Sequence, residues 1–192
     1  MREASPRGDP DSPLGDRPGS ALNPTAKFRA KGYSRLQILL HWTMAALIIF
    51  QLLVNRGMQD AFDDMMDGDR IDSGYWAALH IAVGLAVLAL AIVRVAIRLR
   101  RGASPPDPDH PVVLVWLSMA THLALYGFIF LIPLTGAFAW FGRSEISAEV
   151  HEWARLLLIP LILLHAVGAF VEQFVFHNGT ITRMVVPTHK SD

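Results

Sequence analysis

The sequence contains no cysteine among its 192 residues. This absence excludes disulfide bonds, cysteine-ligated iron–sulfur clusters and covalent attachment of a c-type haem through a C-x-x-C-H motif. An excess of charge of either sign is also lacking, because 17 basic residues balance 17 acidic ones. This balance gives no indication of nucleic-acid binding, so we predict no nucleic-acid partner. Any metal or prosthetic group must be held by other ligands, and eight histidines are available.

The first 31 residues lack a long apolar run and are rich in Pro, Gly, Asp, Ser and Arg. This composition is typical of a disordered segment. The segment also has no hydrophobic core of the kind found in a cleavable signal peptide. We therefore expect a disordered N-terminal tail over residues 1–31, one membrane domain over 32–187 and a short C-terminal tail over 188–192.

Long apolar runs dominate the rest of the chain, which is 52% hydrophobic overall. A helix needs about 20 predominantly apolar residues to cross the hydrocarbon core of a bilayer, which is about 30 Å thick. Four stretches meet this requirement: 36–54, 75–97, 112–141 and 151–176. We predict an all-α membrane protein whose fold is a four-helix transmembrane bundle.

Basic residues are distributed unevenly around these stretches. Lys and Arg are concentrated before the first stretch and between the second and third, whereas the linker 55–74 carries six Asp and only Arg56 and Arg70. Because positively charged loops remain in the cytoplasm, both termini are predicted to be cytoplasmic and the acidic linker is predicted to lie outside.

Two histidines, His151 and His165, lie fourteen residues apart in the fourth stretch. At about 100° per residue they share one face of a helix, and they are separated by about 21 Å along its axis. A histidine in lipid is costly unless it has a partner or a use. The spacing is compatible with two ligands stacked at different depths, and equally with two histidines hydrogen-bonded inside a bundle.

Two further histidines lie at matching depths in other stretches. With the predicted topology, His41 is near the cytoplasmic start of the first stretch and His80 near the outer start of the second. This gives an outer pair, His80 with His151, and an inner pair, His41 with His165. Two such pairs fit two non-covalent bis-histidine b-type haems held between the helices. Ligation at both faces of the iron favours electron transfer over binding of oxygen or small ligands.

Other interpretations of these histidines remain open at this point. Zinc or another metal would require further ligands, and no Asp, Glu or Cys lies level with either pair in the predicted helices. All four histidines could also have a purely structural role. A fifth, His122, has no evident partner at its depth, and we expect it to form a hydrogen bond to a haem propionate or to Tyr126.

Arg94 is a single charge inside the apolar second stretch. It follows His80 by fourteen residues, so it lies on the same helix face and at the depth of the inner pair. An unpaired arginine there would be costly, so we expect an anionic partner. The candidates are a haem propionate, which would make Arg94 a cofactor-binding residue, and Glu172, seven residues past His165.

Several short motifs follow one another along the chain in a fixed order. They are YSRLQI at 33–38 followed by His41-Trp42, Leu79-His80, His122 followed by Tyr126, the His151–His165 spacing, and NGTITRM at 178–184. As an ordered set they resemble the bacterial cytochrome b561 family over residues 32–187. In that family His41, His80, His151 and His165 match the axial-ligand positions.

The resemblance implies an inner-membrane dihaem b-type cytochrome that transfers electrons between a periplasmic-side donor and membrane quinone, such as ubiquinone. One branch of the family is a superoxide oxidase that reduces ubiquinone. Other relatives are non-enzymatic membrane subunits that relay electrons for a hydrogenase or another dehydrogenase. Outside the resemblance, a haem-free channel is a third class. Small residues at Ala77, Gly84 and Ala91 are compatible with a homodimer in the lipid membrane.

The acidic linker departs from what a superoxide oxidase needs. Six Asp against two Arg give residues 55–74 a net charge of −4. Superoxide is an anion, and a negative outer surface would repel it at low salt. We therefore expect the donor to be a basic periplasmic redox protein, such as a c-type cytochrome, in preference to superoxide.

Overall fold

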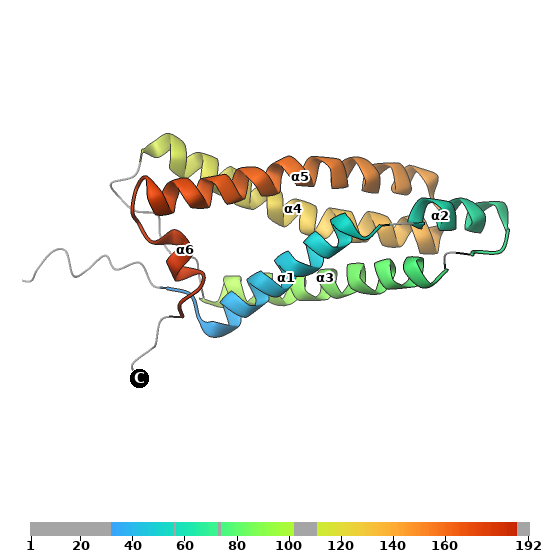
Figure 1. Cartoon of the computed structure of the whole chain (residues 1–192), viewed down its shortest axis with the longest axis horizontal. Helices are drawn as coiled ribbons and strands as arrows, with labels where there is room; N and C mark the ends of the chain where they lie inside the picture. The colour runs from blue at the N-terminus through green and yellow to red at the C-terminus, as the bar shows by residue number, and fades with distance from the viewer. Residues whose placement is uncertain (1–31, 56, 73, 102–110, 188–192) are drawn as a thin grey trace, which may run out of the picture. The chain divides into compact units, whose positions relative to one another are not determined.

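The computed structural model describes residues 32–55, 57–72, 74–101 and 111–187. Within these ranges the chain is helical and contains no strand, which confirms the all-α prediction (Figure 1). The helices are α1 (Arg35–Leu53), α2 (Met58–Asp67), α3 (Gly74–Arg101), α4 (Val112–Gly142), α5 (Glu145–Phe174) and α6 (Thr180–Arg183). The predicted tails, 1–31 and 188–192, lie outside the described residues.

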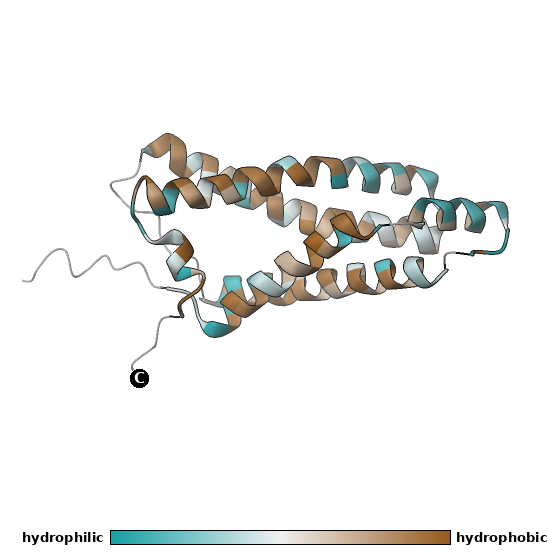
Figure 2. Ribbon diagram, viewed as in Figure 1, coloured by the Kyte–Doolittle hydropathy of each residue, from teal (hydrophilic) through white to brown (hydrophobic). Residues whose placement is uncertain are grey.

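Four of these helices, α1, α3, α4 and α5, are long and apolar enough to cross a membrane. At about 1.5 Å per residue, even the 19 residues of α1 approach the thickness of the hydrocarbon core. Figure 2 shows their apolar character along most of their length. Large apolar side chains such as Leu39, Trp153 and Phe170 are more than half exposed, as expected of residues that face lipid. The chain is a multi-pass membrane protein.

The start of α1 is set by a reciprocal cap. The backbone N–H of Gln37 donates to Ser34 Oγ at 3.4 Å, and the backbone N–H of Ser34 donates to Gln37 Oε1 at 3.1 Å. These bonds satisfy donors that the first helical turn leaves unpaired. The helix therefore begins at Arg35, and His41 lies in its second turn.

The start of α5 differs from that of the predicted fourth stretch, which begins at residue 151. The helix begins at Glu145, where the backbone N–H of Ser147 donates to Ser144 Oγ at 3.3 Å. Glu145 in the first turn also complements the positive end of the helix dipole. As a result His151 lies about two turns inside α5, on a rigid part of the helix.

The short helices α2 and α6 were not expected from the sequence. In α2, Ala61 and Met65 are buried and the helix packs on α3. The segment around α6 returns to the bundle: the indole N–H of Trp42 donates to the Met184 carbonyl at 2.8 Å. The backbone N–H of Ile181 donates to the Gln173 side-chain oxygen at 3.0 Å, which holds α6 against the end of α5.

The long helices pack in sequence, α1 on α3, α3 on α4, and α4 on α5. Small residues of α3 lie in these seams, since Ala77 and Ala91 are each only 1% exposed. A Cβ on Gly84 would lie 3.4 Å from the amide nitrogen of Gln51 on α1, an ordinary contact distance, so α3 faces α1 at this residue. The small residues thus pack within the chain, and a homodimer stays a prediction.

Candidate functional site

The outer histidine pair joins α3 to α5. His80 lies about two turns into α3 and His151 about two turns into α5. Their ring centres are 6.1 Å apart, and the ring planes cross at 72°. The structure thus brings together two residues that are separated by more than 70 positions in the sequence.

The inner histidine pair joins α1 to α5. The ring centres of His41 and His165 are 6.2 Å apart, with planes crossing at 67°. The helices α1 and α5 make few direct contacts with each other, since this pair is not among the helices that pack closely together. The rings of both histidine pairs that were predicted from their depths lie close together in the structure.

The separation within each pair suits a metal ion between the rings. A metal–nitrogen bond is about 2.0 Å long, and the centre of an imidazole lies about 1.1 Å beyond the bonded nitrogen. Two imidazoles on opposite sides of one metal therefore have centres roughly 6 Å apart. The outer and inner pairs both match this separation.

His122 on α4 is a neighbour of the inner pair. Its ring centre lies 5.1 Å from that of His165, with the planes crossing at 88°. This distance is too short for a metal between the two rings and is typical of an edge-to-face contact. The Nδ1 atom of His122 lies 2.7 Å from the Ser118 carbonyl oxygen. The expected hydrogen bond to Tyr126 does not occur among the described residues, and the Arg98 guanidinium lies 5.4 Å from the Tyr126 ring centre.

The His151 ring is held by two backbone features of α4. Its Nδ1 lies 2.8 Å from the Ile132 carbonyl oxygen. Because a carbonyl oxygen only accepts hydrogen bonds, Nδ1 carries the ring proton in this contact. A Cβ on Gly136 would lie 2.9 Å from the ring, so glycine is needed for this approach. With Nδ1 bonded to the carbonyl, Nε2 is left as the ligand atom, an arrangement common among metal-binding histidines.

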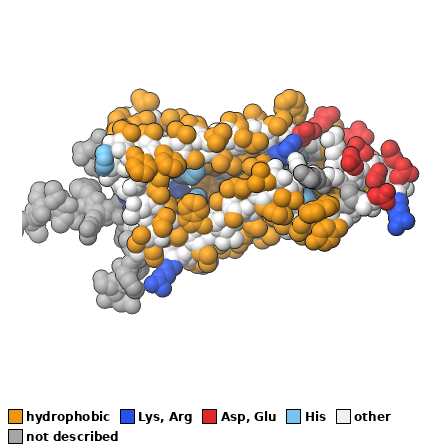
Figure 3. Space-filling model, viewed as in Figure 1, with side chains coloured by type: hydrophobic (Ala, Val, Ile, Leu, Met, Phe, Trp, Pro, Cys, Tyr) orange, Lys and Arg blue, Asp and Glu red, His pale blue; other side chains and the backbone are white. Residues whose placement is uncertain are grey.

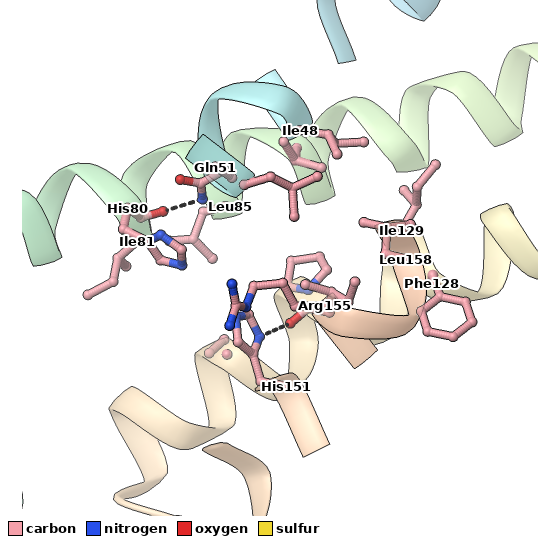
Figure 4. Close-up of a pocket in the computed structure, with 17 residues that line it drawn as sticks. Ile48, Gln51, His80, Ile81, Leu85, Phe128, Ile129, His151, Arg155 and Leu158 are labelled. Atoms are coloured by element: carbon pink, nitrogen blue, oxygen red, sulfur yellow. Dashed lines mark hydrogen bonds between the residues drawn. The ribbon is translucent and has the colours of Figure 1, made fainter. Parts of the chain in front are cut away.

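A pocket extends from the outer pair toward the middle of the helices (Figure 4). Its walls are mainly apolar, and the polar side chains among its lining residues are those of Gln51, His80, His151 and Arg155. An apolar pocket with a few convergent polar groups is what a flat, largely hydrophobic cofactor requires. Two buried polar atoms there, Gln51 Oε1 and His80 Nδ1, have no hydrogen-bond partner among the described residues.

An arginine lies beside each histidine pair. Arg94 is close enough to His41 and His165 to act on both electrostatically, and it has no ion pair or hydrogen bond with any described residue. The alternative partner, Glu172, accepts a hydrogen bond from the Asn178 amide.

The second arginine, Arg155, was not identified from the sequence. It lines the outer pocket, and its guanidinium approaches Glu152 at 3.8 Å. The spacing of four residues from His151 could have revealed it, because residues i and i+4 share one face of a helix.

These residues fit b-type haem. Each pair supplies two imidazoles at a suitable separation, and the described chain offers no cysteine for a covalent link. The described ranges also contain no cluster of three or more His, Asp or Glu arranged to hold a bare metal ion. A haem iron needs only two axial ligands from the protein because the porphyrin supplies the other four.

Comparisons with known proteins agree with this geometry. The chain is 33% identical over 161 residues to cytochrome b562 of Cereibacter sphaeroides, covering 81% of this chain and 96% of that relative. It is 26% identical over 178 residues to a Yersinia pestis protein named probable superoxide oxidase CybB, covering 81% and 96%. It is 23% identical over 177 residues to cytochrome b561 homolog 2 of Escherichia coli, covering 80% and 90%.

The family model of prokaryotic cytochrome b561 matches residues 32–187, which include all six helices and both histidine pairs. The chain therefore belongs to the prokaryotic cytochrome b561 family, membrane electron-transfer cytochromes with b-type haem.

Proposed function

We propose that this chain is a dihaem cytochrome that transfers electrons between a donor on the periplasmic side and quinone in the bacterial inner membrane. The supporting observation is the two histidine pairs, with ring centres 6.1 and 6.2 Å apart, at two depths along α5. When bound, each haem iron supplies a reversible one-electron couple. The outer pair is His80 with His151, and the inner pair is His41 with His165.

The protein groups have distinct tasks in this scheme. The imidazoles of each pair would hold one haem iron and would leave it no open position for a small ligand. Arg94 presents its positive charge to the inner site without an ion pair in the described chain, so an anionic haem propionate is the favoured partner. Glu172 is the weaker candidate because it already bonds to Asn178. Arg155 brings a positive charge to the outer site, although its guanidinium also approaches Glu152 at 3.8 Å.

The separation of the two sites suits electron transfer across the membrane. Fourteen residues of α5 separate His151 from His165, a rise of about 21 Å out of the roughly 30 Å of hydrocarbon. We infer that both termini are cytoplasmic, which places the His41/His165 site on the inner side. Quinone, most simply ubiquinone, exchanges electrons there.

The charge of the outer end favours a basic protein as the donor. Exposed Asp side chains of α2 and the residues after it gather at one end of the molecule (Figure 3). They are Asp60, Asp63, Asp67, Asp69 and Asp72. A surface of this sign attracts a cationic protein and repels superoxide, although a relative carries the name of a superoxide oxidase.

Purified protein in detergent, with a ubiquinone analogue, tests the proposal. A pyridine haemochrome assay should give about two b haems per chain, since each site requires one iron. A basic c-type cytochrome should then support quinone reduction without any further subunit. One haem per chain would mean that one histidine pair is misassigned. Haem content without turnover would instead identify a relay subunit for a partner dehydrogenase. Turnover with superoxide that is insensitive to salt would favour the superoxide oxidase branch.

A further inference from the structure

Gln51 is a polar side chain near the outer end of the apolar helix α1. Its amide nitrogen donates to the backbone carbonyl of His80 on α3 at 2.8 Å (Figure 4). Only the nitrogen of an amide can donate to a carbonyl, so this bond determines which way the amide faces. Gly84, one turn after His80, lies beside this contact: a Cβ there would be 3.4 Å from the amide nitrogen of Gln51.

This orientation leaves the side-chain oxygen of Gln51 buried and without a hydrogen-bond partner among the described residues. On α3, Nδ1 of the His80 ring is likewise buried and has no such partner. A polar atom left unpaired inside a membrane protein is costly, because no water is available to replace the missing bond. The two atoms are complementary, since one is an acceptor and the other donates when it carries the ring proton.

The two histidines of the outer pair differ in this respect. His151 has the Ile132 carbonyl as a partner for its Nδ1, whereas His80 has none among the described residues. Histidines that bind a metal through one nitrogen almost always donate the other N–H to an acceptor, which orients the ring and raises its basicity. A complementary group for His80 is the oxygen of Gln51, which has no partner among the described residues and belongs to a side chain already bonded to the His80 backbone.

We propose that Gln51 is the positioning residue of His80, with its side-chain oxygen as the acceptor for the Nδ1–H of the axial ligand. In the structure the two atoms are not bonded to each other. A small rotation of the ring or of the amide, or one bridging water, completes the contact once the iron holds Nε2. The proposal rests on the proposed function, because it assumes that His80 is a haem ligand.

Redox titration of purified Gln51→Leu and Gln51→Glu tests this assignment, together with the low-spin ferric EPR signal of each haem. An acceptor at Nδ1 makes the imidazole more basic and stabilises ferric iron. Gln51→Leu should therefore raise the potential of the outer haem, by up to about tenfold in the reduction equilibrium or about 59 mV. Its EPR signal should shift, while the inner haem keeps both values. Gln51→Glu retains an acceptor oxygen, so its outer potential should stay at or below that of the wild type.

Ile49→Ala serves as the control, because Ile49 lies on the same helix but is 51% exposed and does not line the pocket. An unchanged outer potential in Gln51→Leu would overturn the proposal, as would a rise in both Gln51 variants or an equal rise in Ile49→Ala. If Gln51→Leu fails to retain the outer haem, the outer potential of Gln51→Glu tests the proposal instead. A potential at or below that of the wild type supports it, and a higher one overturns it. Absence of haem from the wild type would overturn the proposed function itself, and the wild-type absorption spectrum distinguishes that case.

Discussion

At the residue scale, the orientation of His151 depends on backbone atoms of α4. The Ile132 carbonyl oxygen lies 2.8 Å from its Nδ1, and the bare Cα of Gly136 faces its ring. A ligand ring held against one helix by both a hydrogen bond and close packing loses little freedom when it binds iron. Preorganisation of this kind strengthens binding because less entropy is lost at that step.

We predict that Gly136→Ala displaces His151 and weakens the outer haem site. The added methyl group would lie 2.9 Å from ring atoms of His151, closer than such contacts normally allow. Haemochrome analysis should show a loss approaching one of about two haems per chain. Gly127→Ala on the same helix is the matched control, because nothing lies within 4 Å of the Cβ position there. Equal haem loss in the two variants would contradict the steric explanation.

A second prediction concerns the independence of the two sites. His151→Ala removes an outer ligand but leaves His41 and His165 in place, so about one b haem per chain should remain. The remaining haem should keep its redox potential. His177→Ala, beyond the C-terminal end of α5 and outside both histidine pairs, should retain both haems. Complete haem loss from a His151→Ala protein with wild-type helix content would refute the pairing of the histidines.

Arg94 should tune the inner haem through its charge. A positive charge close to the iron favours the reduced form, which carries one more electron. Arg94→Gln is therefore expected to lower the inner potential, with little change at the outer haem. Arg98→Gln removes a charge one turn further along the same helix, where the guanidinium instead faces Tyr126. Similar shifts in the two variants would show that Arg94 has no special position.

At the element scale, α2 shows how a short amphipathic helix can be overlooked in a polar linker. Its apolar positions, which recur with helical spacing, are Met58, Ala61, Phe62, Met65 and Met66. That pattern is the ordinary signature of a helix with one buried face. The many Asp residues are also typical of a polar loop, so the helix was not predicted. In the structure Ala61 and Met65 pack toward α3, and most of the Asp side chains remain exposed.

The charge of α2 leads to a prediction about the donor. Replacing Asp60, Asp63 and Asp67 by Asn should slow reduction by a basic c-type cytochrome at low ionic strength and accelerate reduction by superoxide. The differences should fade above roughly 0.15 M salt, where the screening length is about 8 Å. Stopped-flow absorbance of the haems measures both rates. If the triple variant leaves the cytochrome rate and its salt dependence unchanged, α2 is not part of the docking surface.

At the scale of the whole molecule, the absence of cysteine makes the predicted topology easy to test. Any introduced cysteine is the single thiol in the chain. In intact spheroplasts, Asp67→Cys on α2 should react with a membrane-impermeant maleimide, and Thr182→Cys on α6 should react only after lysis. Both positions are exposed in the structure, so access depends on the side of the membrane. The reverse pattern would place both termini outside.

The sequence alone determined the membrane spans and the depths of the histidines. The predicted spans of 19 to 30 residues follow directly from the thickness of the bilayer. The helical rise of about 1.5 Å per residue then separates His151 from His165 along one helix, and the predicted topology assigns His41 and His80 to the same two levels. Residue numbers contain the distances along a helix, and the positions of the basic residues predict the direction of each span. The bounds of α5 were less accurate because its start depends on a local cap at Ser144.

Only the tertiary structure decided which groups on neighbouring helices contact each histidine. The 5.1 Å contact of His122 with His165, the Ile132 carbonyl at His151 and the Gln51 amide at His80 each join two different helices. Periodicity places a residue on a face of its own helix but does not say how neighbouring helices are rotated or which backbone atoms they present. Those relations arise from side-chain packing across the seams, where for example the missing side chain of Gly136 leaves room for the His151 ring.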